Sequence, residues 1–262
     1  MPYRRPQYRG ITLIELLIGI TLSLFILSML IEIFLATEKN HRALAALTDL
    51  QDNANIAIQL LSKSIRTAGY SGCAQIFPMQ RIEAKSNAII IHRAAPSAAI
   101  LLEPMHNYTN LRVTQSPLFI KNKALFISDC QSAEIFFPKQ IKKMHGAQMI
   151  ETNHPLKFLY DRFAEVSELE TQTFFVAQTG RYTEQGQPIS ALYVNKTELV
   201  EGVDTIKFQY TILLNHSLIE KNADELDGNE KIRGISIELT LSSLNSFPLQ
   251  KKAYTYVALR EG

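Results

Sequence analysis

Residues 10–35 read GITLIELLIGITLSLFILSMLIEIFL, and this stretch decides how the rest of the chain is organised. It contains two acids, Glu15 near its start and Glu32 near its end, and no charged side chain between Leu16 and Ile31. At about 1.5 Å per helical residue the stretch is long enough to cross a hydrocarbon core of about 30 Å. We therefore predict a transmembrane helix in which Glu15 is a costly exception.

A short basic leader precedes this helix. Arg4, Arg5 and Arg9 place the leader in the cytoplasm by the positive-inside rule, so the chain after Leu35 is expected in the periplasm. A secretory signal peptide would have a shorter apolar region followed by a small-x-small cleavage site, which is missing here. An ordinary single-span anchor fits the length but does not explain Glu15.

A carboxylate inside a membrane costs roughly 2.5–3.5 kcal/mol on insertion scales, so Glu15 calls for a partner. The segment Gly10-Ile11-Thr12-Leu13-Ile14-Glu15 resembles the prepilin processing site: a basic leader ends in Gly, and Glu stands at the fifth mature position. By this resemblance prepilin peptidase cuts after Gly10 and methylates Ile11, where most family members have Phe. Glu15 then compensates the new amine of a neighbouring subunit as helices pack into a filament.

The composition is that of a globular protein joined to a membrane helix. The chain has 262 residues, 46% of them hydrophobic and 20% charged, which is enough for one head domain with a sizeable core. The net charge of +2 falls to about −1 without the leader, because the leader carries three Arg and no acid. No basic patch with interleaved aromatic residues occurs, so we expect no direct binding of nucleic acid.

Cys73 and Cys130, the two cysteines, both follow the membrane segment. The periplasm is oxidising, and an even count there favours a disulfide. A bridge closing a loop of nearly sixty residues stabilises the fold by roughly 4 kcal/mol in the chain-entropy model. A redox or metal-binding pair would need CxxC or nearby His spacing, which is absent.

The helical pattern continues beyond the membrane, and we predict one helix over residues 11–68, roughly 85 Å long. No Pro lies between Pro6 and Pro78, and Gly69 is a natural stop. Glu32 stands near the place where many major pilins have a kink-forming Pro; it either reaches the interface or contacts a partner helix. Apolar residues expected to face a globular head recur at steps of three and four: Leu44, Leu47, Leu50, Ala54, Ile58, Leu61, Ile65 and Ala68.

The sequence at the end of this helix indicates which group of prepilin-type proteins the chain resembles. The segment 65–73, IRTAGYSGC, resembles the PilW family of type IV pilus minor pilins, with J-type pseudopilins of type II secretion as related proteins. Tyr70 is expected to pack back on the head, and Cys73 to pin the following loop to Cys130. Residues 199–210, 232–237 and 256–260 resemble the last strands of the same family. Little is recognisable between residues 76 and 197 beyond Cys130.

The resemblance implies an α+β, pilin-like fold: a long N-terminal helix, transmembrane in its first half, packs on an antiparallel β-sheet head. The expected division is a leader at 1–10, a span at 11–36, the periplasmic half of the helix at 37–69 and the head at 70–262. Of the adjacent Phe174 and Phe175, one is expected in the core. The expected strands are short apolar runs at 88–92, 111–114, 124–128, 134–137, 173–178, 189–195, 205–213 and 235–241.

No other part of the chain indicates catalysis or metal binding. The polar loop 216–231, between the last two of these strands, collects acids beside a Gly but lacks the spacing of an EF-hand, so it is read as a solvated hairpin tip rather than a calcium site. The six His are scattered, and Lys139, Lys142 and Lys143 are read as surface residues. No nucleophile or phosphate-binding motif occurs, so we predict neither an enzyme nor a cofactor.

The resemblance therefore implies a minor pilin that is anchored in the inner membrane and then joins a pilus at the cell surface. Its implied partners are other minor pilins, the major pilin, a tip adhesin, prepilin peptidase and the inner-membrane assembly platform. The implied roles are priming of assembly at the tip, adhesion, twitching motility and DNA uptake. Two alternatives stay open: a minor pseudopilin of type II secretion, and a membrane-anchored periplasmic binding domain that never polymerises.

Overall fold

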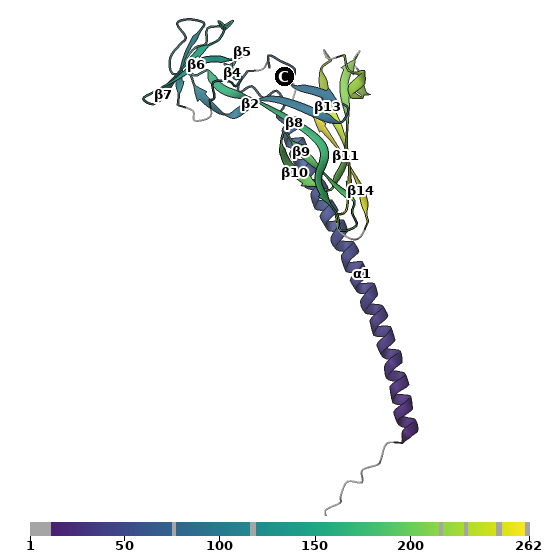
Figure 1. The fold of residues 1–262 in the computed structure, drawn as a ribbon. Helices are drawn as coiled ribbons and strands as arrows, with labels where there is room; N and C mark the ends of the chain where they lie inside the picture. Colours follow the sequence, from purple (N-terminus) through teal and green to yellow (C-terminus); the bar gives the residue numbers. More distant parts are fainter. Residues whose placement is uncertain are drawn as a thin grey trace, which may run out of the picture.

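A computed structural model of the protein describes residues 12–74, 77–115, 119–214, 217–227, 230–244 and 248–259. One long helix, α1, carries a head of antiparallel strands arranged in three sheets (Figure 1). This confirms the predicted α+β fold class. The elements are α1 (Leu13–Arg66), β1 (Ile82–Lys85), β2 (Ala88–Ile100), β3 (Asn110–Thr114), β4 (Leu125–Ser128), β5 (Ala133–Phe136), β6 (Pro138–Met144), β7 (Ala147–Thr152), β8 (Glu165–Tyr182), β9 (Pro188–Val194), β10 (Thr197–Glu201), β11 (Val203–Leu214), β12 (Ser217–Lys221), the 3-10 turn η1 (Ala223–Glu225), β13 (Ile232–Ser242) and β14 (Gln250–Ala258).

Helix α1 is continuous, as its unbroken apolar pattern predicts. Its membrane half is exposed along its whole length, whereas one face of its second half is buried against the head. The predicted apolar stripe was wrong at its start: Leu44 and Leu47 are 64% and 47% exposed because they point to a side of the helix that the head does not cover. The buried residues are instead Ala46, Leu50, Ala54, Ala57, Leu61, Ser62 and Ile65.

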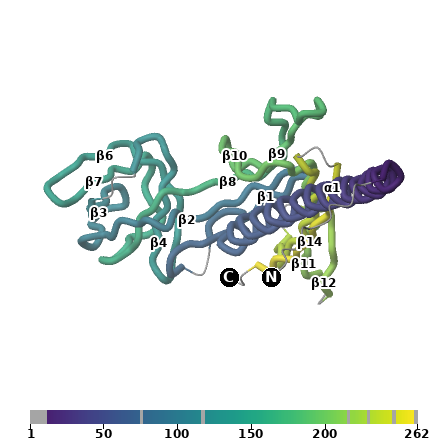
Figure 2. Tube along the Cα trace, turned by 90° about the horizontal axis from the view of Figure 1, so that it is seen from below, coloured from purple at the N-terminus to yellow at the C-terminus, as the bar shows by residue number. Residues whose placement is uncertain are grey.

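The part of the head around the end of α1 is called the proximal lobe here. Seen from below, α1 runs between the β9–β10 hairpin on one side and the sheet β12-β11-β13-β14 on the other (Figure 2). Its core joins helix residues such as Leu61 to Phe174 of β8 and to Phe208 of β11, which are at most 4% exposed. As predicted for the Phe174–Phe175 pair, Phe174 is the core residue; Phe175 stacks on Tyr193 on the other face of the strand.

A second core defines the distal lobe. It lies beyond the end of α1 and projects to one side of it (Figure 1). The sheet β3-β7-β6 and the strands β4 and β5 surround buried residues such as Leu111, Ile127 and Tyr160. β2 and β8 enter both lobes, with a shift in their register between Ala94 and Ala98, and they connect the two cores.

The eight predicted strands lie within or close to observed strands, but two features differ from the prediction. Residues 88–92 and 173–178 are only the centres of the long strands β2 and β8. The region 216–231 is not one polar loop, because β12 pairs with β11 from Leu214↔Ser217 to Tyr210↔Lys221 and η1 follows it. β11 therefore lies between β12 and β13.

Candidate assembly site at the start of the helix

The Glu15 carboxylate is bound by the residue that begins the helix. Glu15 Oε2 accepts hydrogen bonds from the backbone N–H and the hydroxyl of Thr12, both at 3.0 Å, and Thr12 Oγ1 accepts one from the Glu15 N–H at 3.4 Å. This reciprocal pair is a capping box, which satisfies donors that a helix start leaves free. The acid that is costly in a membrane therefore has partners within its own chain.

Gly10 and Ile11, the predicted cleavage and methylation residues, lie outside the described residues. Their place relative to Glu15 is known only along the chain: Ile11 is the residue next to Thr12, whose N–H donates to the carboxylate. A cut after Gly10 would thus create a new α-amine one residue before the helix cap. The new amine would therefore lie next along the chain to Thr12, the residue that binds the Glu15 carboxylate.

A notch on the helix surface follows Glu15. Glu15, Gly19 and Ser23 recur at steps of four, and they line a hollow together with Leu16 and Leu27. Apart from its chain neighbours and the local helix backbone, no atom lies within 4 Å of where a Cβ of Gly19 would be. Small residues at a spacing of four allow two membrane helices to approach closely, so this face suits contact with another helix.

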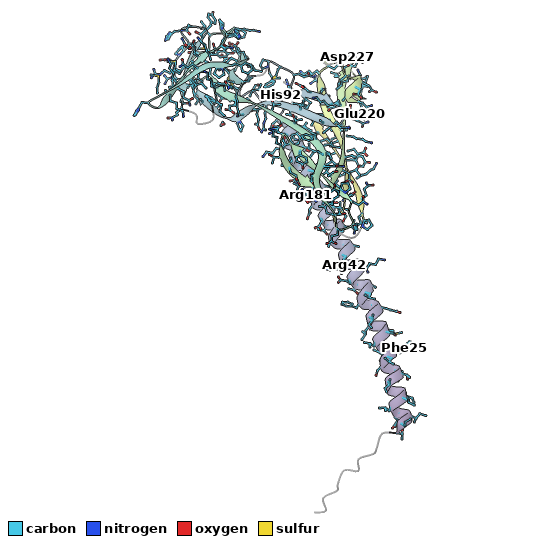
Figure 3. All side chains as sticks on the ribbon, in the orientation of Figure 1. Phe25, Arg42, His92, Arg181, Glu220 and Asp227 are labelled. Atoms are coloured by element: carbon cyan, nitrogen blue, oxygen red, sulfur yellow. A yellow bond between two sulfur atoms is a disulfide. The ribbon has the colours of Figure 1, made fainter. Side chains whose placement is uncertain are left out.

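The rest of the membrane half leaves few backbone or side-chain polar groups for lipid to meet. Thr21, Ser23 and Ser28 each donate their hydroxyl to a carbonyl three or four residues earlier in α1, at 2.7–2.9 Å. α1 contains an 18-residue window of mean hydropathy 2.4, with none of it buried in the protein, so it is long and apolar enough to cross a membrane. Phe25, labelled in Figure 3, projects from this bare part of the helix.

At the other end of α1, the predicted Cys73–Cys130 pair forms a disulfide in the structure. It ties the segment leaving the helix to the turn between β4 and β5 in the distal lobe. Tyr70, which was expected to pack back on the head, is 45% exposed, and its carbonyl accepts a hydrogen bond from the Ala94 N–H at 2.8 Å.

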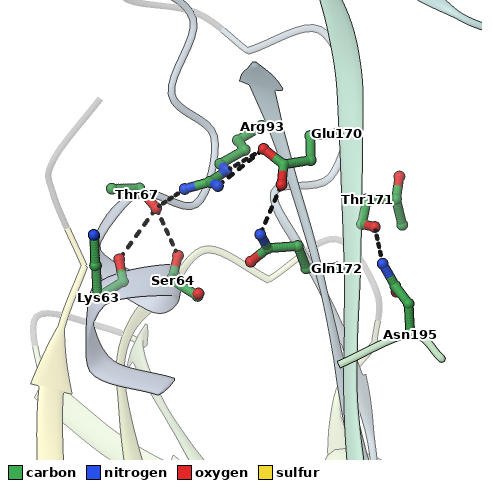
Figure 4. A network of polar contacts seen from close by, with 8 residues as sticks. All are labelled: Lys63, Ser64, Thr67, Arg93, Glu170, Thr171, Gln172 and Asn195. Atoms are coloured by element: carbon green, nitrogen blue, oxygen red, sulfur yellow. Dashed lines mark hydrogen bonds and ion pairs between the residues drawn. The ribbon is translucent and has the colours of Figure 1, made fainter. Parts of the chain in front are cut away.

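A polar network also holds the helix end against the strands that lead to the distal lobe (Figure 4). Arg93 of β2 donates to Thr67 Oγ1 at 2.9 Å, and its Nε and Nη2 atoms each lie 2.9 Å from Glu170 Oε2 of β8. Gln172 donates to the second oxygen of Glu170 at 2.8 Å. Thr67, the C-cap of α1, contacts the carbonyls of Lys63 and Ser64.

The acidic segment after β12, which was considered as a calcium site, is held by contacts within the head. In the acidic segment after β12, Lys221 lies 2.6 Å from Glu230 Oε1, and this hydrogen bond, with the charges of Glu230, Asp227 and Glu225, raises the Lys221 pKa. Part of that segment, residues 228–229, lies outside the described residues. Within the described ranges no three His, Cys, Asp or Glu side chains could hold a metal ion.

The scattered His and the three lysines read as surface residues also have places in the structure. Buried His92 contacts Thr171 Oγ1 at 3.0 Å and Glu83 Oε1 at 3.1 Å, which accounts for both of its ring nitrogens. Four other His are exposed, and His216 lies outside the described residues. Lys139, Lys142 and Lys143 are exposed on β6, at the edge of the sheet β3-β7-β6, and Lys139 pairs with Glu151.

The sequence reading missed Thr12 and Arg93. Thr12 could have been found, because Thr-x-x-Glu before an apolar run is a known helix-start signature. Arg93 gave no such signal, since its partner Glu170 is 77 residues away.

A family model described as the prokaryotic N-terminal methylation motif matches residues 5–31, which include Gly10, Ile11 and Glu15. No curated protein and no solved structure matches the chain. The chain is therefore a pilin-like or pseudopilin-like protein with a prepilin-type methylation motif. The motif implies processing by prepilin peptidase, anchoring in the inner membrane and then assembly into a pilus-like fibre. Proteins of this kind are structural subunits and typically not enzymes.

Proposed function

We propose that this protein is a minor pilin of a type IV pilus, of the PilW kind, that helps to start pilus assembly. The leader 1–10 is removed by cleavage after Gly10, and Ile11 is methylated. Residues 11–36 hold the product in the inner membrane, and residues 37–69 with the head at 70–262 lie in the periplasm. Assembly moves the protein into the fibre with other minor pilins, the major pilin and a tip adhesin.

The observation that carries the proposal is the position of Glu15. It is the acid nearest the helix start in a segment otherwise suited to lipid, and it stands five residues after Gly10. The Thr12 cap satisfies its hydrogen bonds but does not cancel its charge. A methylated amine from a neighbouring subunit supplies the missing positive charge. This charge compensates the cost of a carboxylate in the apolar stretch.

The mass of the N-terminus, measured on protein from membranes and from sheared fibres, tests the processing step. We expect a chain that begins at N-methylated Ile11 in both fractions. A chain that begins at Met1 would refute the proposal and favour an anchored periplasmic domain that does not polymerise.

Substitutions at Glu15 test the assembly step. We expect Glu15→Ala to be cleaved normally and to enter fibres at least tenfold less, because the carboxylate meets its amine only in the fibre. Glu15→Gln keeps the capping geometry and loses only the charge, so it should fail equally if the charge is what matters. Glu38→Ala is the control: it removes an exposed acid of the same helix beyond the apolar stretch, and it should enter fibres normally. Normal incorporation of both Glu15 variants would refute the role given to this residue.

Deleting the protein tests whether it acts in a type IV pilus or in type II secretion. A minor pilin predicts loss of surface pili with normal secretion of exoproteins, together with loss of twitching and DNA uptake. The opposite result would assign the protein to type II secretion as a pseudopilin. The resemblance of residues 65–73 and of the last strands to the PilW family supports the first outcome.

A further inference from the structure

A cavity of about 480 Å³ lies at the end of the head that is nearer the membrane half of α1. The turn between β8 and β9, the start of β11 and the turn between β13 and β14 form it. Arg181, at the end of β8, marks this end of the head in Figure 3. Asn53 of α1 donates to the carbonyl of Glu201, just before β11, at 3.3 Å, so the cavity lies beside the helix. Its volume is in the range of about 300–1,000 Å³ that is usual for ligand pockets.

The lining of this cavity combines apolar and amide side chains. Half-buried apolar residues form its inner part: Ile189, Leu244 and Leu249. Exposed glutamines form its outer part: Gln185, Gln187 and Gln250. The side-chain amides of these glutamines have no hydrogen-bond partner within the described residues. They are therefore free to bind the peptide groups of a ligand.

Asp204 is the one charged side chain among the described lining residues, and it has no cation. Its Oδ2 accepts a hydrogen bond from Ser242 Oγ, and no Lys, Arg or His in the described part of the chain pairs with it. Residues 245–247, Asn-Ser-Phe, are neighbours of the lining in the sequence and lie outside the described residues; they carry no charge. A half-buried charge is stabilised by a partner of opposite sign, so the cavity suits a cation.

Acids near the cavity favour a ligand of the same sign. Glu184 and Glu201 are sequence neighbours of two lining residues. Arg181 pairs with both Glu198 and Glu201, so two carboxylates share one positive charge. A negative potential at a concave site concentrates cations there. Phosphate and carboxylate ligands are disfavoured, because no cationic side chain is among the described lining residues.

The apolar part of the lining indicates the kind of cation. Calcium and magnesium need several oxygen ligands, and the described residues contain no group of three His, Cys, Asp or Glu that could hold a metal ion. Lysine and arginine instead combine an aliphatic stem, which packs on apolar surface, with a charged end. We propose that the cavity binds a protein segment that carries a lysine or arginine, with the stem along Leu244 and Leu249 and the charged end at Asp204.

The height of the cavity above the membrane indicates where this segment comes from. Asn53 stands 18 residues after Leu35, the end of the apolar stretch, which is about 27 Å along the helix. The headgroup layer on one side of a bilayer is only about 5–8 Å thick, so an amine-bearing lipid headgroup does not reach the cavity. A neighbouring subunit of the fibre does reach this height. The source of the segment therefore rests on the proposed function, whereas the chemistry of the cavity does not.

Peptide binding to the full chain in detergent tests the chemistry of the cavity without any fibre. The probes are acetyl-Ser-Lys-Ser-amide and the same peptide with its lysine ammonium acetylated, followed by NMR of the peptide with protein-free micelles as the blank. We expect the first peptide to bind about tenfold more tightly, since acetylation removes the charge that meets Asp204. Equal binding of the two peptides, or binding of neither, would overturn the proposal.

Substitutions around the cavity show whether the charge of Asp204 causes that preference. Asp204→Asn removes the charge while its amide oxygen can still accept from Ser242, and we expect the preference for the lysine peptide to disappear. Ser242→Ala keeps the charge and should retain the preference. Glu184→Gln is the matched control, because it neutralises an exposed acid that is not among the lining residues. A preference that survives in Asp204→Asn would contradict the site.

Photo-crosslinking in cells that make the fibre identifies the segment. A photoreactive benzoylphenylalanine replaces either Gln187 or Gln250, which belong to different turns, and mass spectrometry identifies the crosslinked residues. We expect both positions to reach one segment that contains Lys or Arg, and Asp204→Asn to lower both crosslinks about tenfold. Such a segment supports the site whether it belongs to another kind of subunit or to a second copy. Scattered crosslinks, a segment without Lys or Arg, or no crosslink in protein that begins at Ile11 and enters fibres would overturn the proposal and leave the minor-pilin function standing.

Discussion

At the scale of single residues, backbone conformation and surrounding space explain why position 72, in the segment leaving α1, is a glycine. Its φ of +67° lies in the left-handed region, and a Cβ there would be 2.5 Å from Glu165 Oε2. Gly146, after β6, has a similar φ of +69°, but a Cβ added there would meet open space. The two glycines therefore share the backbone requirement and differ in the space around them.

We expect Gly72→Ala to lower the free energy of unfolding by about 2–4 kcal/mol, and Gly146→Ala by only about 1–2 kcal/mol. The difference between the two losses is the free energy needed to move the Glu165 side chain away from the new Cβ. Urea unfolding of the full chain in detergent, followed through tyrosine fluorescence because the protein has no Trp, measures both. Equal losses would mean that Glu165 moves aside freely, which would contradict a steric role for Gly72.

A second residue-scale prediction concerns the acids after β12. The Lys221 ammonium already lies against Glu230 and near Asp227 and Glu225, so a cation is built into this segment. We expect millimolar calcium to leave the melting temperature unchanged, with magnesium as the control. Because a ligand that binds only the folded state raises the melting temperature, a rise specific to calcium would show a site here after all.

At the scale of elements, prediction succeeded where burial imposes a regular period. α1 is a long repeat of apolar residues without Pro, and the alternation in β11 and β13 reflects one buried and one exposed face. β6 and β12 carry no such pattern because nearly all of their side chains are exposed. Their strand structure comes from pairing with β7 and β11, which a local pattern does not record.

The Arg93 network is the element-scale contact that we expect to matter most for stability. It joins the α1 cap to β2 and β8, and the side chains of Arg93 and Glu170 are only 18% and 34% exposed. We expect Arg93→Met to lower the free energy of unfolding by about 1–2 kcal/mol, because Glu170 keeps only its bond from Gln172.

Arg42→Met is the matched control for that variant. It breaks an ion pair with Glu38 on the bare part of α1, where the two side chains are 66% and 46% exposed. Such a pair contributes about 0.5 kcal/mol or less, so the control should be almost neutral. If both variants lost the same stability, the network of Figure 4 would have no special role in holding the helix end.

At the scale of the whole molecule, the two-lobed head could not be predicted. The expected strands contained only the centres of β2 and β8, because their outer parts depend on pairs such as Ala99↔Val166, whose residues are far apart in the chain. The cysteines were an exception, because the periplasmic setting made a disulfide the simplest expectation. The structure adds what that bond joins: the exit from the helix and the distal lobe.

The position of this disulfide leads to a prediction about the two lobes. It spans 57 residues, so its removal costs about 4 kcal/mol in the chain-entropy model. We expect the double variant Cys73→Ala/Cys130→Ala to lose stability mainly in the distal lobe. Within the described residues, β2, β8 and the small cluster of Phe77, Ala94 and Phe126 would still connect that lobe to the rest of the head.

Hydrogen exchange of the full chain in detergent measures the effect strand by strand. Amides of β4 and β5, next to the Cys130 turn, should exchange much faster in the double variant, while α1 residues near Leu61 and the strands β11 and β13 stay protected. The proximal core does not contain the bridge, and α1 packs directly on it. Wild-type protein treated with dithiothreitol should give the same pattern, since only the covalent bond differs. An equal loss of protection in both lobes would show that the head unfolds as one unit, and that the disulfide stabilises all of it.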